Sequence, residues 1–145
     1  MKFIYCQIIS ILALLSLALE KSPAHKDLLD YKFFCFNGKV RFFKIDIGRF
    51  VEHHANYYDT NGQLLEFWEK GIEPDLNYPI ELPDNLKERI SLAERLSKNK
   101  PFLRVDFYNI NGKIYFGELT FYPASGMVLW TSEEADNTIG KLLIY

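Results

Sequence analysis

The sequence predicts an α+β domain with a mostly antiparallel sheet and one main helix. Strand-like stretches, residues 31–36 and 39–47, flank Asn37-Gly38, a dipeptide that favours the tight turn of a β-hairpin. Asn61-Gly62 and Asn111-Gly112 separate further apolar stretches in the same way. Between these hairpins lies one long stretch with helical spacing of apolar residues. At 145 residues the chain is long enough for one domain with a core.

The main helix is expected after a proline-rich loop at 71–83 and before Pro101. Asn85 and Glu88 have the spacing of a capping box at its start. Its inward face is expected to carry Leu86, Ile90, Ala93 and Leu96. The last strands are expected at 102–109 and 113–122, and a short final helix is expected from the Ser132 cap to Gly140.

Composition narrows the function classes. The formal net charge is -2, and no basic stripe is present, so the sequence does not predict nucleic-acid binding. The two cysteines, Cys6 and Cys35, do not make a disulfide framework, and Cys35 is expected to be a buried small hydrophobic residue.

Residues 1–26 form a hydrophobic leader that differs from the domain at 27–145. Lys2 precedes an apolar run at residues 3–19, at the short end of the length that spans a membrane. Three interpretations stay open: a secretion signal, a membrane anchor, or an aberrant start of the chain.

The last hairpin, "RVDFYNINGKIYFGELTFYPASGM" at 104–127, carries charges among apolar residues. Alternation places Arg104 and Asp106 on one face of their strand, and places Ile114, Phe116, Glu118 and Thr120 together on one face of the next. A two-residue loop would pair Asp106 with Gly117 and turn Glu118 to the opposite face. A three-residue loop, 110–112, pairs Arg104 with Glu118, and we expect that loop.

In that register Asp106 and Glu118 are diagonal neighbours, ~7 Å apart at Cβ. Two carboxylates at this separation can share a hard cation such as Mg²⁺. The competing interpretation is a ladder of salt bridges in which Arg104 neutralises Glu118.

Together with "DYKFFCFNGKVRFF", "NYYDTNGQLLEFW", "PDNLKERISLAERLSKNKPFL" and "EEADNTIGKLL", this hairpin resembles the TupA-like ATP-grasp family. The resemblance runs from about residue 28 to residue 145. It implies the C-terminal subdomain of the ATP-grasp fold, with ATP and Mg²⁺ as cofactors. By the same resemblance, Asp106 and Glu118 hold Mg²⁺ on the ATP phosphates, with Thr120 in the place of the usual Asn ligand. The resemblance also implies that Arg104 is the catalytic residue, which would stabilise charge on the transferred phosphoryl group or on the acyl-phosphate intermediate.

The remaining implied contacts concern the nucleotide. Asp30 matches the acidic position that contacts the ATP ribose, and Lys32 is a candidate phosphate ligand unless it is solvated on an edge strand. Ser125 and Gly126 lie in the loop 123–126, which either closes on the phosphates or acceptor or is a simple turn.

The implied reaction is ligation of a carboxylate to an amine through an acyl phosphate, on small-molecule or polymer-precursor substrates of cell-surface polysaccharide synthesis of the teichuronopeptide type. The alternatives are a glycosyltransferase-type protein of the same pathway, and a non-catalytic, secreted or degenerate β-rich module. Ligation predicts a cytoplasmic location, including the inner membrane face if residues 3–19 associate with it; a true signal peptide predicts secretion. Because no glycine-rich ATP-binding half precedes residue 27, the isolated chain is expected to bind Mg-ATP weakly and to be inactive.

Overall fold

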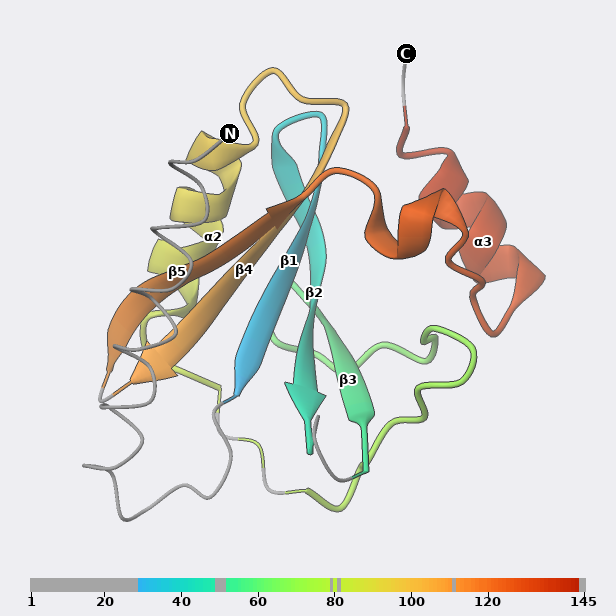
Figure 1. Cartoon of the computed structure of the whole chain (residues 1–145), viewed down its shortest axis with the longest axis horizontal. Helices are drawn as coiled ribbons and strands as arrows, with labels where there is room; N and C mark the ends of the chain where they lie inside the picture. The colour runs from blue at the N-terminus through green and yellow to red at the C-terminus, as the bar shows by residue number, and fades with distance from the viewer. Residues whose placement is uncertain (1–28, 49–51, 79, 81, 111, 144–145) are drawn as a thin grey trace, which may run out of the picture.

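The computed structural model describes residues 29–48, 52–78, 80, 82–110 and 112–143. The leader at 1–26, with its apolar run at 3–19, lies outside this part of the chain. No helix among the described residues has the length and apolar character needed to cross a membrane. The elements, shown in Figure 1, are β1 (Asp30–Phe36), β2 (Lys39–Ile47), β3 (His54–Asp59), α2 (Leu86–Leu96), β4 (Phe102–Ile110), β5 (Lys113–Thr120), the 3-10 helix η1 (Pro123–Gly126) and α3 (Glu133–Gly140).

The five strands form one antiparallel sheet in the order β3-β2-β1-β4-β5. Strand β1 is therefore central. It pairs with β2 on one edge and with β4, which follows α2 in the chain, on the other edge. The two helices lie on opposite sides of the sheet, α2 at the left and α3 at the right of Figure 1. The predicted α+β architecture, with its antiparallel sheet and one main helix, is confirmed.

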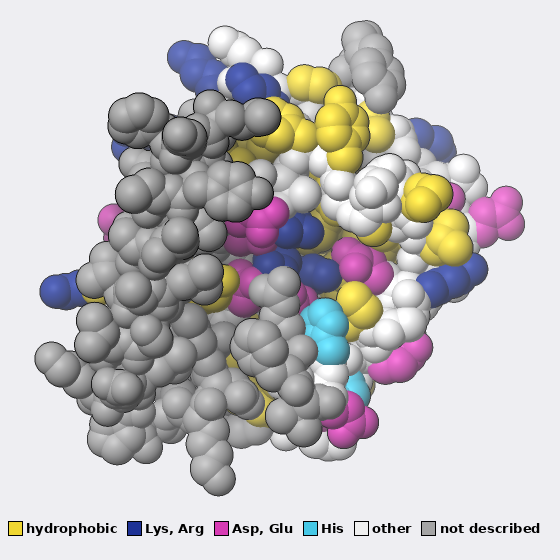
Figure 2. Space-filling view, in the orientation of Figure 1, with side chains coloured by type: hydrophobic (Ala, Val, Ile, Leu, Met, Phe, Trp, Pro, Cys, Tyr) yellow, Lys and Arg dark blue, Asp and Glu magenta, His cyan; other side chains and the backbone are white. Residues whose placement is uncertain are grey.

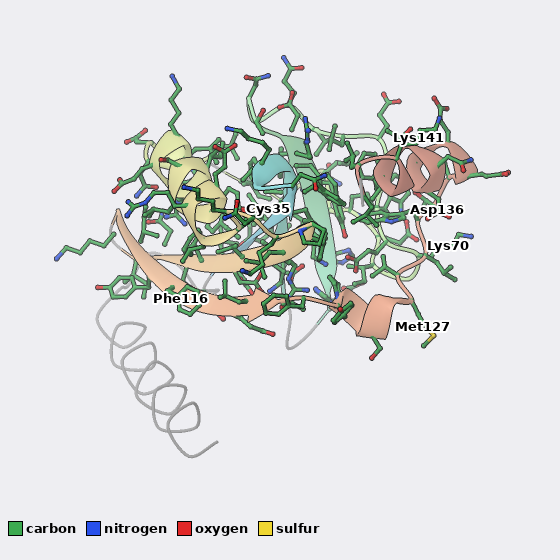
Figure 3. All side chains as sticks on the ribbon, turned by 90° about the horizontal axis from the view of Figure 1, so that it is seen from above. Cys35, Lys70, Phe116, Met127, Asp136 and Lys141 are labelled. Carbon is green, nitrogen blue, oxygen red and sulfur yellow. The ribbon has the colours of Figure 1, made fainter. Side chains whose placement is uncertain are left out.

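Helix α2 covers an apolar sheet face. Phe33, Phe43 and Val105 are fully buried there, and Ala93 and Ile90 of the helix pack against this cluster. Cys35 is also fully buried, as expected from the sequence, and Figure 3 shows it on the side of the sheet toward α2. Burial raises the pKa of its thiol to about 11, so it is a packing residue and not a nucleophile.

The start of α2 differs from the prediction. Asn85 makes no capping hydrogen bond. Its amide nitrogen donates to the Gly112 carbonyl at 2.8 Å, and its amide oxygen accepts from Nε of Arg89 at 2.8 Å. The predicted capping box is wrong because Asn85 ties the helix to the β4–β5 turn instead. Arg89, which the apolar pattern did not place inward, is fully buried with its guanidinium 4.7 Å from the Tyr31 ring centre, whereas Leu96 is exposed.

The opposite sheet face is apolar at one end. Phe34 stacks on Phe42 with ring centres 4.6 Å apart, and Trp130 packs edge-on against both rings. Ala135 and Ile139 bring α3 onto this cluster. The Ser132 cap of α3 is confirmed, since the Ser132 side chain accepts a hydrogen bond from the Ala135 backbone N–H at 3.0 Å. Towards the other end of the face the side chains become charged.

The β4–β5 register corrects the predicted hairpin loop. Ile110 pairs with Lys113, so the loop has two residues and not three. The extra residue is Gly117, a bulge on β5 that lets Phe107 pair with Phe116 while Asp106 pairs directly with Glu118. Because of the bulge, the four β5 residues that were expected to share one face lie on two opposite faces. Phe116 packs against Phe107 and Ile114 joins the apolar core under α2, whereas Glu118 and Thr120 lie on the charged face.

Gly117 is expected to be hard to replace. A Cβ at this position would lie 3.0 Å from the Asp106 carbonyl oxygen and 3.0 Å from the Tyr108 ring. We predict that Gly117→Ala lowers the free energy of unfolding by about 1–3 kcal/mol, as overpacking does. Gly140→Ala is the control, because nothing lies within 4 Å of its Cβ position. Equal stabilities of the two variants in urea unfolding would contradict the role given to the bulge.

Candidate functional site

Three neighbouring strands each carry an acid and a base at alternating positions of one face. The pairs are Asp30 and Lys32 on β1, Lys44 and Asp46 on β2, and Arg104 and Asp106 on β4. Figure 2 shows basic and acidic side chains adjoining one another near the middle of the face in view, with histidine beside them. All of these six residues are buried except Arg104, which is partly buried.

Asp106 is held by two cations. The Arg104 guanidinium makes a bidentate interaction with the Asp106 carboxylate, in which Nε donates to Oδ1 at 2.9 Å and Nη2 donates to Oδ2 at 2.8 Å. The Lys32 ammonium donates to Oδ2 from the other side at 2.8 Å. The Asp106 residue is only 2% exposed, so these charge-assisted bonds replace the water that the carboxylate has lost. Burial alone would lower the pKa of Arg104, but the bonds to Asp106 outweigh it and raise that pKa.

Lys32 also bonds to Asp30, its neighbour two residues earlier, and its Nζ lies 3.6 Å from Oδ2 of Asp46. Burial would lower the pKa of Lys32, yet the attraction of Asp30 and Asp106 is larger and raises it, which keeps the ammonium charged. The pKa of Asp30 is raised by burial despite the nearby lysine. Lys32 is therefore an internal cation on the central strand, and not a solvated lysine on an edge strand.

The charged cluster continues onto β2 and the loop after β3. Lys44 Nζ lies 3.6 Å from Oδ1 of Asp46 and donates to Oε2 of Glu69 at 3.2 Å. His53 Nε2 lies 3.4 Å from the same Asp46 oxygen. Between β1 and β2 like charges face each other directly, Lys32 opposite Lys44 and Asp30 opposite Asp46, so attraction across that pair of strands is diagonal. Between β1 and β4 opposite charges face each other directly, Lys32 opposite Asp106.

Glu118, which is exposed, and Thr120, which is partly buried, form the rim of this cluster. Glu118 lies opposite Asp106 and Thr120 lies opposite Arg104. Glu118 is exposed, and its Oε1 accepts a hydrogen bond from the Thr120 hydroxyl at 3.0 Å. Directly opposed residues of an antiparallel pair lie closer than the diagonal neighbours that the sequence predicted. The predicted pairing of Arg104 with Glu118 across the two strands is wrong, because the register places Thr120 opposite Arg104. The Arg104 guanidinium bonds to Asp106 of its own strand.

Six of the eight candidate residues come together here: Asp30, Lys32, Arg104, Asp106, Glu118 and Thr120. Ser125 and Gly126 lie beyond β5 in η1, and within the described ranges no hydrogen bond or ion pair links them to this group. Their loop has left-handed backbone at Ala124, Ser125 and Gly126, with φ of 46°, 57° and 79°. Such φ values are uncommon outside glycine and are found at functional loops.

The sequence reasoning missed Lys44, Asp46, Glu69 and His53. A signal for the first two was present, because Lys44 and Asp46 repeat the alternation of an acid and a base seen at 30–32 and 104–106. Glu69 and His53 had no such signal, since they come from outside the paired strands and reach the cluster only through the folded chain.

A family model described as TupA-like ATP-grasp matches residues 8–144. The chain belongs to this family. The match begins earlier than the resemblance noted from residue 28, and it covers most of the 145-residue chain. Comparisons with curated proteins and with solved structures gave no match. Membership supports an ATP-grasp-related function, and enzymes of this kind generally use ATP and Mg²⁺.

Asp106 at the buried centre and Glu118 and Thr120 at the rim have the oxygen donors that Mg²⁺ prefers. Asp106 and Glu118 offer carboxylates from neighbouring strands, and Thr120 adds a hydroxyl oxygen. Among the described residues, no group of three or more Asp, Glu, His or Cys side chains is arranged so that it could hold a metal ion by itself. Mg²⁺ suits an open site of this kind, because it usually keeps waters and substrate phosphates as ligands. Both Asp106 oxygens bond to Lys32 or Arg104, so a cation here must share or displace one of them.

The burial of these charges predicts unequal costs of removal. Asp106→Asn leaves Lys32 and Arg104 without their shared carboxylate, and we expect the free energy of unfolding to fall by about 3–5 kcal/mol. Glu118→Gln, at the exposed rim, is expected to change it by less than about 1 kcal/mol. Urea unfolding of both variants measures the difference. Similar losses for the two would show that Asp106 is not the buried centre of the cluster.

Proposed function

We propose that the protein is an ATP-dependent carboxylate–amine ligase acting on precursors of a cell-surface polysaccharide. One observation carries this proposal: Arg104, Asp106, Glu118 and Thr120 lie on one sheet face, with the two carboxylates directly opposite each other. Membership in the TupA-like ATP-grasp family supports it. The teichuronopeptide type of polymer is the pathway we propose within this class.

In the proposed reaction a substrate carboxylate oxygen attacks the γ-phosphorus of ATP, and ADP leaves. The amine nitrogen then attacks the carbonyl of the acyl phosphate, inorganic phosphate leaves, and the amine loses a proton. Mg²⁺, when bound, offsets the charge of the phosphates. Asp106, Glu118 and Thr120 would hold it. Arg104, fixed by its two-pronged bond to Asp106, would present its remaining donors to the transferred phosphoryl group.

The nucleotide contacts are part of the same proposal. Asp30 would contact the ribose, and Ser125 and Gly126 would close on the phosphates or the acceptor through the left-handed loop that they share. Lys32 would reach the phosphates only after leaving its carboxylate partners. Because the reaction consumes ATP, we place the protein in the cytoplasm or on the inner membrane face.

A non-catalytic role is the second candidate, and one observation favours it. Both Asp106 oxygens are engaged by Lys32 and Arg104, which is also how a purely structural ion ladder would look. The two candidates differ in one property: a ligase site must take up a divalent cation at Glu118, and a structural ladder need not.

Binding of Mn²⁺, a spectroscopic substitute for Mg²⁺, tests the proposal on the full chain. Electron paramagnetic resonance of free Mn²⁺ should show one bound ion that Mg²⁺ displaces. We predict that Glu118→Gln weakens this binding at least about tenfold, since it removes one charged ligand. Glu133→Gln, on exposed α3, is the matched control and should leave it unchanged.

Two results would contradict the ligase. The first is full Mn²⁺ affinity in Glu118→Gln. The second is the absence of hydroxamate when an intact enzyme of the TupA-like ATP-grasp family is supplied with Mg-ATP, hydroxylamine, and glutamate or glucuronate, because hydroxylamine traps an acyl phosphate.

A further inference from the structure

Lys32 occupies a cage of carboxylates behind the proposed metal site. Its ammonium bonds to Asp30 and to Asp106, the latter at 2.8 Å, and lies 3.6 Å from Asp46. The Lys32 side chain is 5% exposed and the three aspartates are equally buried. An ammonium in this position does the electrostatic work of a bound cation, because it neutralises carboxylates that have lost their water.

The Asp106 carboxylate is shared between this internal cation and the rim. One side of Asp106 faces Lys32 and its cross-strand neighbour on the other side is Glu118. A divalent cation bound at Asp106 and Glu118 would lie close to the Lys32 ammonium, and two positive charges at such a distance repel. Lys32 keeps other carboxylates beside it, because it already bonds to Asp30 and its Nζ lies 3.6 Å from Oδ2 of Asp46, both on the side away from Glu118.

We propose that Lys32 is a resident counter-cation that competes with the divalent cation for Asp106. When the metal binds, its ammonium gives up Asp106, keeps its bond to Asp30 and moves toward Asp46. The inference rests on the metal site of the proposed function and adds what sets its affinity. In this role Lys32 is a positioning residue. Without metal it keeps the Asp106 carboxylate charged and in place. When the metal binds, Lys32 breaks its bond to that carboxylate.

The charge balance of the cluster supports this exchange. Five carboxylates, Asp30, Asp46, Glu69, Asp106 and Glu118, surround three basic side chains, Lys32, Lys44 and Arg104, among the described residues of this face. With the neighbouring His53 counted as neutral, the excess of two negative charges equals the charge of one divalent cation. Lys32 can therefore stay charged inside the protein when Mg²⁺ binds, because the remaining aspartates still neutralise it.

The test compares Mn²⁺ binding by wild type, Lys32→Met and Lys39→Met, measured by the paramagnetic resonance of free Mn²⁺ without nucleotide. Lys32→Met should bind Mn²⁺ at least about tenfold more tightly, the size expected when a close repelling charge is removed. Its unfolding temperature should be lower than that of wild type without metal and should rise more steeply with Mn²⁺. Lys39→Met removes an exposed lysine paired with Glu94 and should match wild type.

Asp30→Asn gives a prediction of opposite sign and serves if Lys32→Met does not fold. It removes the carboxylate charge that holds the Lys32 ammonium when Asp106 binds metal, and should weaken Mn²⁺ binding severalfold. Unchanged Mn²⁺ affinity in a folded Lys32→Met, or tighter binding by Asp30→Asn, would overturn the exchange. If wild type binds Mn²⁺ at a site lost in Glu118→Gln but Lys32→Met binds equally well, only the exchange is wrong. If no variant binds Mn²⁺, the proposed metal site fails as well.

Discussion

The Asp106 carboxylate is buried between the Lys32 ammonium and the Arg104 guanidinium, and the placement of the other charges depends on it. Lys32 belongs to the central strand and Arg104 to β4, so the three side chains meet only because β4 pairs with β1. A carboxylate this deeply buried is stable only while its partners stay in place. The sheet order and the ion cluster therefore support each other, and Glu118 and Thr120 are added to this fixed centre from the outer strand β5.

The sheet face opposite α2 has an apolar end and a charged end, and each stabilises a different part of the structure. Phe34, Phe42 and Trp130 pack with α3 at one end and fix the sheet on that side. At the other end the buried salt bridges hold Arg104 and Asp106 in place. The proposed phosphoryl transfer would need side chains held in this way. Both Asp106 oxygens already bond to Lys32 or Arg104, so in our proposal a cation at Asp106 has to share or displace these partners. The same bonds that hold the carboxylate in place would then lower its affinity for a cation.

Local rules predicted much of the fold. The Asn37-Gly38 hairpin, the Ser132 cap and the extent of β2 follow from neighbouring residues, and the structure confirms them. Contacts between distant residues were not accessible in the same way. The sequence offered Lys32 as an edge-strand residue because nothing local shows that β4 pairs with β1. Gly117 was missed because a bulge inside a strand and a longer turn both add one residue to a hairpin. The prediction that Arg104, Asp106, Glu118 and Thr120 share a face was confirmed through a register different from the expected one.

The most direct test of this account is a crystal structure of the full chain grown with Mn²⁺, in which anomalous scattering locates the ion. The account predicts one Mn²⁺ between the carboxylates of Asp106 and Glu118, with the Lys32 ammonium on Asp30 and Asp46. An ion elsewhere, or a sheet in which Asp106 and Glu118 project to opposite faces, would contradict it.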